Sequence, residues 1–410
     1  MIANATRRLA GRWAAILFLA FLLRLAWALI VPVEPISDSS MYDTFAREIA
    51  AGRGYRFPDD NLTVYWPVGP AALYGLLYSI FGPSGWVVAA INIVMGTATV
   101  GLIGVLGFRT FGEKTGLLAG LLAAIWPLWI QFSTVLSSEL PFVLLICGAL
   151  VVYGTHRIPN AIRVTAYTAL LVAAAYMRPT AIPLILILPA LRIIYTRSFK
   201  QTALELVLAI VVAGALFTPW ALRNQAVFGS PVLVSANFGA NLWMGNNPDS
   251  IGGYMPLPDK KFRNEVVRDE YFKDKAFSFI RDNPQQYIML CIQRIQHSFS
   301  RETIGVAWNK LDFSPLTVTI IKAGSSGYWL LVFALAVAGA IRFVWSNPIR
   351  IFEPMILISG LFTAVAVLVV GQDRYHMPLM PFVAIFAAYF IDTCICQPKR
   401  MNMPTTHHEF

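Results

Sequence analysis

The sequence is poor in charged side chains. Only 13% of its 410 residues are Asp, Glu, Lys or Arg, whereas 57% are hydrophobic. A chain of this length needs more polar surface than that to stay dissolved in water, so the composition excludes an ordinary soluble domain. The bilayer must therefore be the main solvent of this protein.

Cysteine is scarce, and positive charge is not concentrated anywhere. Cys147, Cys291, Cys394 and Cys396 lack metal-ligand spacing, and we assign them no chemistry. The net charge is +10, but the basic residues are scattered between apolar runs and are not gathered on one face. This scatter argues against nucleic acid as a partner and is typical of the cytoplasmic loops of a membrane protein.

Long apolar runs are abundant instead. A bilayer core of about 30 Å needs roughly 20 apolar residues per helical crossing, which divides the chain into about ten predicted spans. These are residues 13–31, 86–108, 115–132, 139–155, 164–177, 180–195, 203–220, 322–343, 353–370 and 377–396. We expect an all-α polytopic membrane protein whose first span is retained, because no small-residue cleavage site follows it.

The basic residues of the short loops predict the orientation. With a cytoplasmic N-terminus, the opposite short loops hold only Arg178 and Arg374. The inside set is Arg7, Arg8, Arg12, Arg109, Lys114, Arg157, Arg163, Arg192, Arg197, Lys200, Arg342, Arg350, Lys399 and Arg400. The sequence therefore predicts a multi-pass protein of a bacterial inner membrane.

The predicted spans also divide the chain into parts. We expect an N-terminal membrane module at 1–220 with a first periplasmic loop at 32–85, and a second periplasmic segment at 221–321. The C-terminal spans occupy 322–396, and 397–410 form a cytoplasmic tail. Helical spacing predicts a surface helix at Tyr42 to Ala51 and two helices at Lys260 to Arg281 and Pro284 to Arg301.

Asp38 is the first candidate for chemistry. It lies a few residues beyond the first span, which places a carboxylate at the periplasmic membrane surface. A general base for a sugar hydroxyl must be such an acceptor, and partial desolvation can tune its pKa. The structural alternative is that Asp38, with its neighbouring serines, caps the surface helix.

Another acid and several arginines extend this candidate site. Glu139 begins the fourth span, where it either has a functional partner or favours the positive end of the helix dipole. Guanidinium groups suit phosphate oxygens, although an arginine near a helix end can also snorkel to lipid headgroups. The candidate phosphate-binding residues are Arg178, Arg374, Arg223 and Arg24.

Aromatic and amide side chains are candidates for contacts with a sugar or an acceptor. Tyr65 and Trp66 belong to a Pro- and Gly-interrupted hairpin that returns to the membrane, where an interfacial aromatic belt also explains them. The stretch from Ser235 to Met255 is rich in Gly and Asn, which argues against a regular helix there. Its Trp243, Asn246 and Asn247 either line a site or fold the loop onto itself, and His376 is a further candidate.

These residues together resemble the GT-C superfamily of integral-membrane glycosyltransferases. The likeness is to bacterial family 39, which includes protein O-mannosyltransferases and the lipid A aminoarabinose transferase. It rests on the order of SDSSMYDTFAREIAAGRGY, YWPVGPAALY, SSELPF, MRPTA, TPWALRNQAVFG, NFGANLWMGNNPDSIGGY and RYHMPLMPF.

The resemblance implies a function for the candidate residues. Asp38 corresponds to the catalytic base, and the arginines correspond to the basic residues that hold the lipid phosphate. A second acid often follows the base, but here Ser39 stands in that place and Asp43 is the candidate substitute. No cofactor is firmly implied, and a divalent metal stays possible.

The expected reaction moves a sugar from a polyprenyl-phosphate donor to a periplasmic glycan, lipid or protein, with membrane lipids as neighbours. We expect the 221–321 segment to recognise the acceptor. Two other functions stay open. One is a polysaccharide or lipid transporter or flippase, and the other is an O-antigen polymerase or ligase, for which Arg281, Arg294 and Arg301 would be the key residues.

Overall fold

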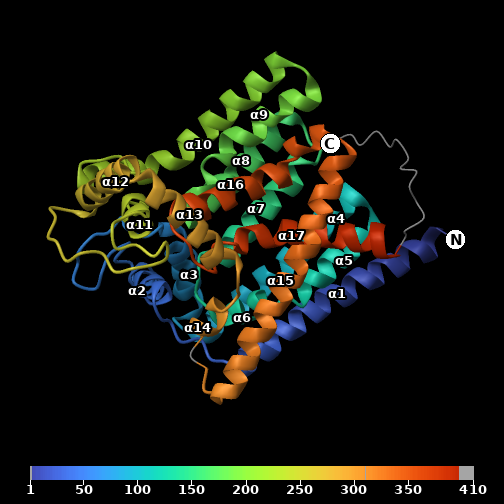
Figure 1. The fold of residues 1–410 in the computed structure, drawn as a ribbon, viewed down its shortest axis with the longest axis horizontal. Coiled ribbons are helices and arrows are strands. Elements are labelled where there is room, and N and C mark those ends of the chain that lie inside the picture. The colour runs from blue at the N-terminus through green and yellow to red at the C-terminus, as the bar shows by residue number, and fades with distance from the viewer. Residues whose placement is uncertain (1, 310, 397–410) are drawn as a thin grey trace.

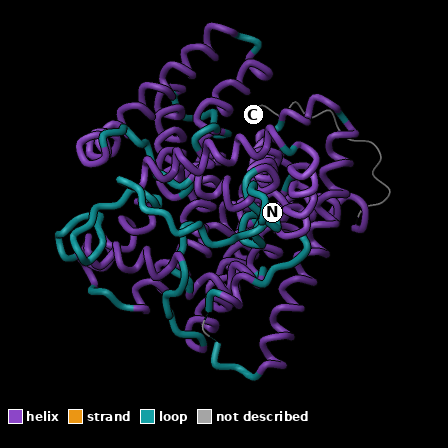
Figure 2. Tube along the Cα trace, turned by 60° about the vertical axis from the view of Figure 1, so that its left-hand side comes forward, coloured by secondary structure: helices purple, strands orange, loops and turns teal. Residues whose placement is uncertain are grey.

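The protein is built from helices and connecting loops (Figure 2). The computed structural model describes residues 2–309 and 311–396, so the predicted tail at 397–410 lies outside the described residues. Within the described ranges the one extended pairing is an isolated bridge between Arg56 and Leu62. The expected all-α class is confirmed.

The helices fall into three successive groups. The first group is α1 (Ile2–Ile30), α2 (Asp38–Ala50), α3 (Val68–Phe81), α4 (Gly85–Phe111), α5 (Glu113–Ala124), α6 (Pro127–Gln131) and α7 (Glu139–Tyr153). The second is α8 (Asn160–Met177), α9 (Leu184–Thr196) and α10 (Phe199–Phe228). The third is α11 (Phe238–Gly245), α12 (Glu265–Asp282), α13 (Pro284–Phe299), α14 (Ile304–Ala307), α15 (Pro315–Ser346), α16 (Pro354–Leu368) and α17 (Met380–Phe390).

Each predicted span contains a helix, which makes this a multi-pass membrane protein. Among the described residues, 5 helices are long and apolar enough to cross a bilayer alone, or up to 6 if a bent pair is one span. The remaining spans fall on shorter helices such as α7 and α16. The number of ten crossings therefore stays a prediction.

The span predicted at 115–132 is broken. Helix α5 ends at Ala124, and α6 begins at Pro127 after a bend of 52°. Proline has no N–H to donate and disfavours a helical residue before it, which favours a break or a bend in the helix at this point. The predicted span thus consists of two helices, and its passage through the whole bilayer stays a prediction.

Two helices were missed because their glycines and prolines indicated loops. The aromatic hairpin leads directly into α3, whose Gly69 packs so closely on α8 that a Cβ would lie 2.5 Å from the Tyr176 carbonyl oxygen. The Gly- and Asn-rich stretch contains α11, whose Gly239 packs against α12 so closely that a Cβ would overlap the backbone carbonyl oxygen of Asp269. These glycines allow helices to approach each other and do not interrupt them.

The segments outside the long helices gather at one end of the molecule. In Figure 1, α2, α11 and α12 lie together at the left, and the turn from α9 to α10 lies at the top. Glu265 of α12 accepts hydrogen bonds from the Thr63 hydroxyl at 2.9 Å and from the Val64 backbone at 2.6 Å. The two predicted loop segments thus pack against each other, and both the surface helix and the pair α12–α13 are confirmed.

Candidate active site

A cavity of about 410 Å³ opens where α2, α11, the end of α8 and the end of α16 meet. Its apolar lining includes one face of α16, formed by Phe362, Val365, Ala366 and Val369, together with Pro183 before α9. Its polar lining includes Asp38, Tyr65, Asn237, Asn241, Arg178 and Arg374. The cavity can therefore receive a molecule with one apolar part and one polar, anionic part.

Asp38 is held at the start of α2 by its neighbours. Ser37 precedes it with a φ of 55°, an unusual backbone conformation for a residue other than glycine. The Ser39 hydroxyl donates to the Leu136 carbonyl at 2.7 Å, which ties α2 to the segment that leads into α7. The Asp38 side chain is 32% exposed and lines the cavity.

Two carboxylates and two guanidinium groups meet beside this cavity. Arg374 Nη1 lies 2.8 Å from Asp38 Oδ2 and 3.7 Å from Glu139 Oε1. Arg178, which follows the last residue of α8, donates to Glu139 Oε1 at 2.6 Å. Glu139 itself is buried behind the two arginines, with 1% of its side chain exposed.

Burial and the neighbouring charges shift the pKa of Asp38 in opposite directions. Burial raises the pKa, but the Arg374 guanidinium, a hydrogen bond from the Trp66 side chain and the more distant Arg178 outweigh it. The pKa of Asp38 is held below its ordinary value of 3.8. The carboxylate is therefore ionised, and an acceptor of protons, over the whole neutral range.

Arg24 and Arg223, the other predicted phosphate ligands, do not reach the cavity. Arg24 is fully buried and donates to the carbonyl of Ala20 at 2.9 Å and to that of Ala124 at 3.2 Å. Arg223 donates to the carbonyls of Thr63 and Tyr55 at 2.9 and 3.2 Å. Both side chains donate hydrogen bonds to backbone oxygens. The local sequence could not show whether these arginines bind a backbone oxygen or a phosphate.

Asp43 does not join the cluster either. Its carboxylate accepts from Arg47 at 2.7 Å and from the Tyr78 hydroxyl at 2.6 Å, so it links α2 to α3. Tyr65 and Trp66 do line the cavity, with their rings 4.6 Å apart and nearly perpendicular. Of the aromatic residues that the sequence singled out, these two line the cavity.

Trp243, Asn246 and Asn247 fold their own loop instead of lining the cavity. The Asn246 amide donates to the Leu242 and Val369 carbonyls at 2.8 and 3.1 Å. The Asn247 amide donates to the Trp243 carbonyl at 2.7 Å. Their α11 neighbours Asn237 and Asn241, which the sequence did not single out, take the place that was expected for them.

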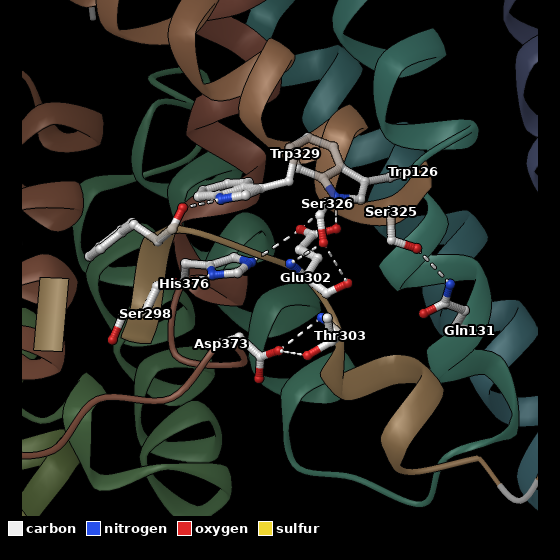
Figure 3. Close-up of polar contacts among 11 residues, drawn as sticks. Trp126, Gln131, Ser298, Glu302, Thr303, Ser325, Ser326, Trp329, Asp373 and His376 are labelled. Carbon is white, nitrogen blue, oxygen red and sulfur yellow. Dashed lines mark hydrogen bonds and ion pairs between the residues drawn. The ribbon is translucent and has the colours of Figure 1, made fainter. Parts of the chain in front are cut away.

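His376 lies in a separate buried cluster that supports the loop of Arg374 (Figure 3). Its Nε2 is 3.1 Å from Glu302 Oε1, and its ring stacks on Trp329 at 4.0 Å. On the other side of Arg374, Asp373 accepts from the backbone and hydroxyl of Thr303 at 2.8 and 2.7 Å. Contacts on both sides of Arg374 thus fix the loop from which its side chain reaches Asp38.

Comparisons with known proteins show a GT-C fold, as the sequence predicted. Residues 66–222, less than half of the chain, match the family described as dolichyl-phosphate-mannose-protein mannosyltransferase. No curated protein matches the sequence.

Solved structures show the same fold at low identity. The apo oligosaccharyltransferase of Archaeoglobus fulgidus has a TM-score of 0.57 at 12% identity and covers 94% of this chain, which spans 50% of that protein. AglB of the same organism, in complex with an inhibitory peptide and a dolichol-phosphate, has a TM-score of 0.53 at 13% identity, with 93% and 50% covered.

A further similarity is to ArnT from Cupriavidus metallidurans bound to undecaprenyl phosphate. The TM-score is 0.44 at 15% identity, with 94% of this chain and 78% of that chain covered. Because this score lies below 0.5, the fold assignment depends on the archaeal structures.

Proposed function

We propose that the protein is a glycosyltransferase that moves a hexosyl or pentosyl group from a polyprenyl-phosphate donor to an acceptor hydroxyl. The observation that carries this proposal is the meeting of Asp38, Arg178 and Arg374 in one cavity that also has an apolar α16 face. A lipid-linked phosphosugar has the matching parts, which are an isoprenoid chain, a phosphate and a sugar.

The proposed reaction is one in-line displacement with inversion. The acceptor oxygen bonds to the anomeric carbon while the bond from that carbon to the phosphate oxygen breaks. Asp38 takes the proton of the acceptor hydroxyl, and the bonding electrons leave with the polyprenyl phosphate. Arg178 and Arg374 stabilise the charge that develops on this leaving group.

The ion pair between Asp38 and Arg374 gives donor binding a second effect. A donor phosphate in the cavity competes with Asp38 for the guanidinium of Arg374, which is 2.8 Å from the carboxylate. Loss of this partner makes Asp38 a stronger base, because the burial that raises its pKa is then less opposed. Donor binding thereby prepares the base for the acceptor.

The residues around the base fit cationic side chains better than a divalent metal. Asp38 and Glu139 have arginine partners, and no group of three or more His, Cys, Asp or Glu side chains that could hold a metal is found within residues 2–309 and 311–396. We therefore propose that guanidinium groups stabilise the negative charge of the leaving phosphate. Activity that survives a chelator and is not raised by added Mg²⁺ or Mn²⁺ would support this.

We further propose that the cavity faces the periplasm of a bacterial inner membrane and that the acceptor is a glycan, a lipid or a protein. The scarcity of basic residues in the short loops on the cavity side supports this orientation. The polymerase or ligase alternative is less favoured, because Arg281, Arg294 and Arg301 do not line the cavity. Arg294 is buried and donates to carbonyls such as that of Val367 at 2.9 Å.

The decisive experiment incubates the purified protein in lipid with a panel of polyprenyl-phosphate sugars and membrane extract as acceptor source. Release of the bare carrier, with transfer of the sugar label, would support the proposal. Movement of intact donor across the bilayer without release of the carrier would establish the transporter alternative instead.

A further inference from the structure

A second polar pocket lies at the N-terminal end of α8, where this helix approaches the turn between α9 and α10. Its volume is about 450 Å³, and its lining includes His156, Arg157, Pro159, Asn160, Arg163 and Arg192. Nothing in the proposed reaction uses these residues. The proposed reaction therefore does not explain why these basic residues line a pocket.

The buried charges of this pocket do not balance. Arg163 and Arg192 are 3% and 6% exposed, and both approach the same carboxylate oxygen, Oε1 of Glu205. The distances, 3.5 Å from Arg163 and 3.7 Å from Arg192, are too long for strong hydrogen bonds. Two buried guanidinium groups thus share one carboxylate, which leaves a positive charge that the burial itself makes costly.

Arg163 Nη1 contacts His156 Nδ1 at 2.8 Å and its Nη2 donates to Asn160 Oδ1, but two other donors of the pocket have no hydrogen-bond partner within the described residues. Nε of Arg163 and Nε of Arg192 are buried without a hydrogen bond. Helix α8 begins after Pro159, which gives no side-chain cap, and its first turn contains no acidic residue. The free N–H groups and the positive dipole end of α8 therefore add to the same electrostatic field.

The location of the pocket limits which kinds of ligand could reach it. Helix α8 has 18 residues, so at about 1.5 Å per residue its two ends are about 27 Å apart. Arg178 lies at one end, in the candidate active site, and this pocket lies at the other end. Retention of basic residues in cytoplasmic loops explains exposed arginines such as Arg157, but it does not explain why Arg163 and Arg192 are buried.

We propose that this pocket binds a phosphate group, presented by an anionic lipid headgroup at the membrane surface opposite the Asp38 cavity. The phosphate supplies the negative charge that Glu205 alone does not, and the guanidinium groups of Arg163 and Arg192, whose Nε atoms lack hydrogen bonds, are its donors. Basic pockets between membrane helices bind anionic headgroups in this way. The bound lipid links α8, α9 and α10 and stabilises the folded protein.

The test uses Arg192→Gln, because this variant leaves one buried guanidinium for one buried carboxylate and should fold. The matched control is Arg197→Gln, which removes the same charge five residues further on, outside the pocket. Thermal unfolding of the full chain in detergent is followed with added phosphatidylglycerol, with phosphatidylcholine, and with inorganic phosphate at constant ionic strength.

We expect phosphatidylglycerol, but not phosphatidylcholine, to raise the unfolding midpoint of the native protein and of Arg197→Gln. Loss of one charge-assisted donor should weaken this effect in Arg192→Gln by about tenfold in apparent affinity. An equal shift in all three proteins, or no shift in any, would overturn the proposal. If millimolar inorganic phosphate alone reproduces the variant-dependent shift, the phosphate site holds and its lipid source is wrong.

Discussion

The two ends of α8 carry similar groups in different proportions. At the C-terminal end, Arg178 and Arg374 face two carboxylates, Glu139 and Asp38. At the N-terminal end, two buried arginines share Glu205, the one carboxylate that pairs with them among the described residues. The first cluster is complete in charge, and the second is one negative charge short.

This difference indicates how each end meets an anion. At the balanced end an incoming phosphate must displace Asp38 from Arg374, so that binding and activation of the base are coupled. At the unbalanced end an anion need not displace the carboxylate and adds a missing charge. The first arrangement suits a substrate that must come and go, and the second suits a ligand that stays.

The largest effect is expected from Asp38→Asn, which removes the base and leaves the shape of the balanced cluster. The rate of sugar transfer should fall by about 10²–10⁴-fold, the usual contribution of a positioned base. Binding of the polyprenyl phosphate should be retained and somewhat tighter, since both arginines remain and the phosphate no longer competes with a carboxylate for Arg374. The rate is measured as release of labelled carrier, with binding followed separately.

The matched control for this variant is Asp43→Asn. It lies on the same helix, and its carboxylate contacts Arg47 and Tyr78 outside the cavity. Normal transfer by a folded Asp38→Asn protein would remove the base from the mechanism.

Arg374→Gln should remove one positive charge from the same cluster, which leaves Arg178 with two carboxylates. Loss of one preorganised donor to a developing charge costs about 10²–10³-fold in rate. Unlike the loss of the base, it should also weaken the binding of the polyprenyl phosphate. Arg374→Lys should restore part of the binding but not the two-pronged geometry.

Arg281→Gln is the control for the loss of an arginine, because Arg281 is 79% exposed and pairs with Asp282. If Arg281→Gln impairs transfer more than Arg374→Gln does, the key arginines lie in the 221–321 segment, and the polymerase alternative gains support.

Glu139→Gln should make the C-terminal end of α8 resemble the N-terminal end, with two arginines for the single carboxylate of Asp38. Removing one partner from a buried ion pair typically destabilises a protein by about 3–5 kcal/mol. We expect a lower unfolding midpoint that polyprenyl phosphate restores to a greater extent than in the native protein. Equal stabilisation of both proteins by the ligand would show that charge balance does not govern this cluster.

The sequence alone predicted the fold class and singled out the four charged residues that meet beside the cavity, but their catalytic roles stay a prediction. Apolar length located the long helices, and position relative to the first span located Asp38. Arg24 and Arg223 were misleading because an arginine bonded to backbone carbonyls has the same local sequence as one that binds phosphate. Asn237 was missed because its place in the cavity wall depends on how α11 packs against segments far away in the chain.

The smallest expected effect concerns pH. The pKa of Asp38 is lowered, so its contact with Arg374 stabilises the folded state above pH 3.8 and is lost as the pH falls through the lowered value. Asp38 should therefore cause no loss of kcat/KM between neutral pH and about pH 5. In Arg374→Gln the burial of Asp38 is less opposed, so the acid limb of the kcat/KM profile should move to higher pH, whereas in Glu139→Gln it should stay low. A limb that moves equally in both variants, or in neither, would mean that Arg374 does not hold the charge of Asp38.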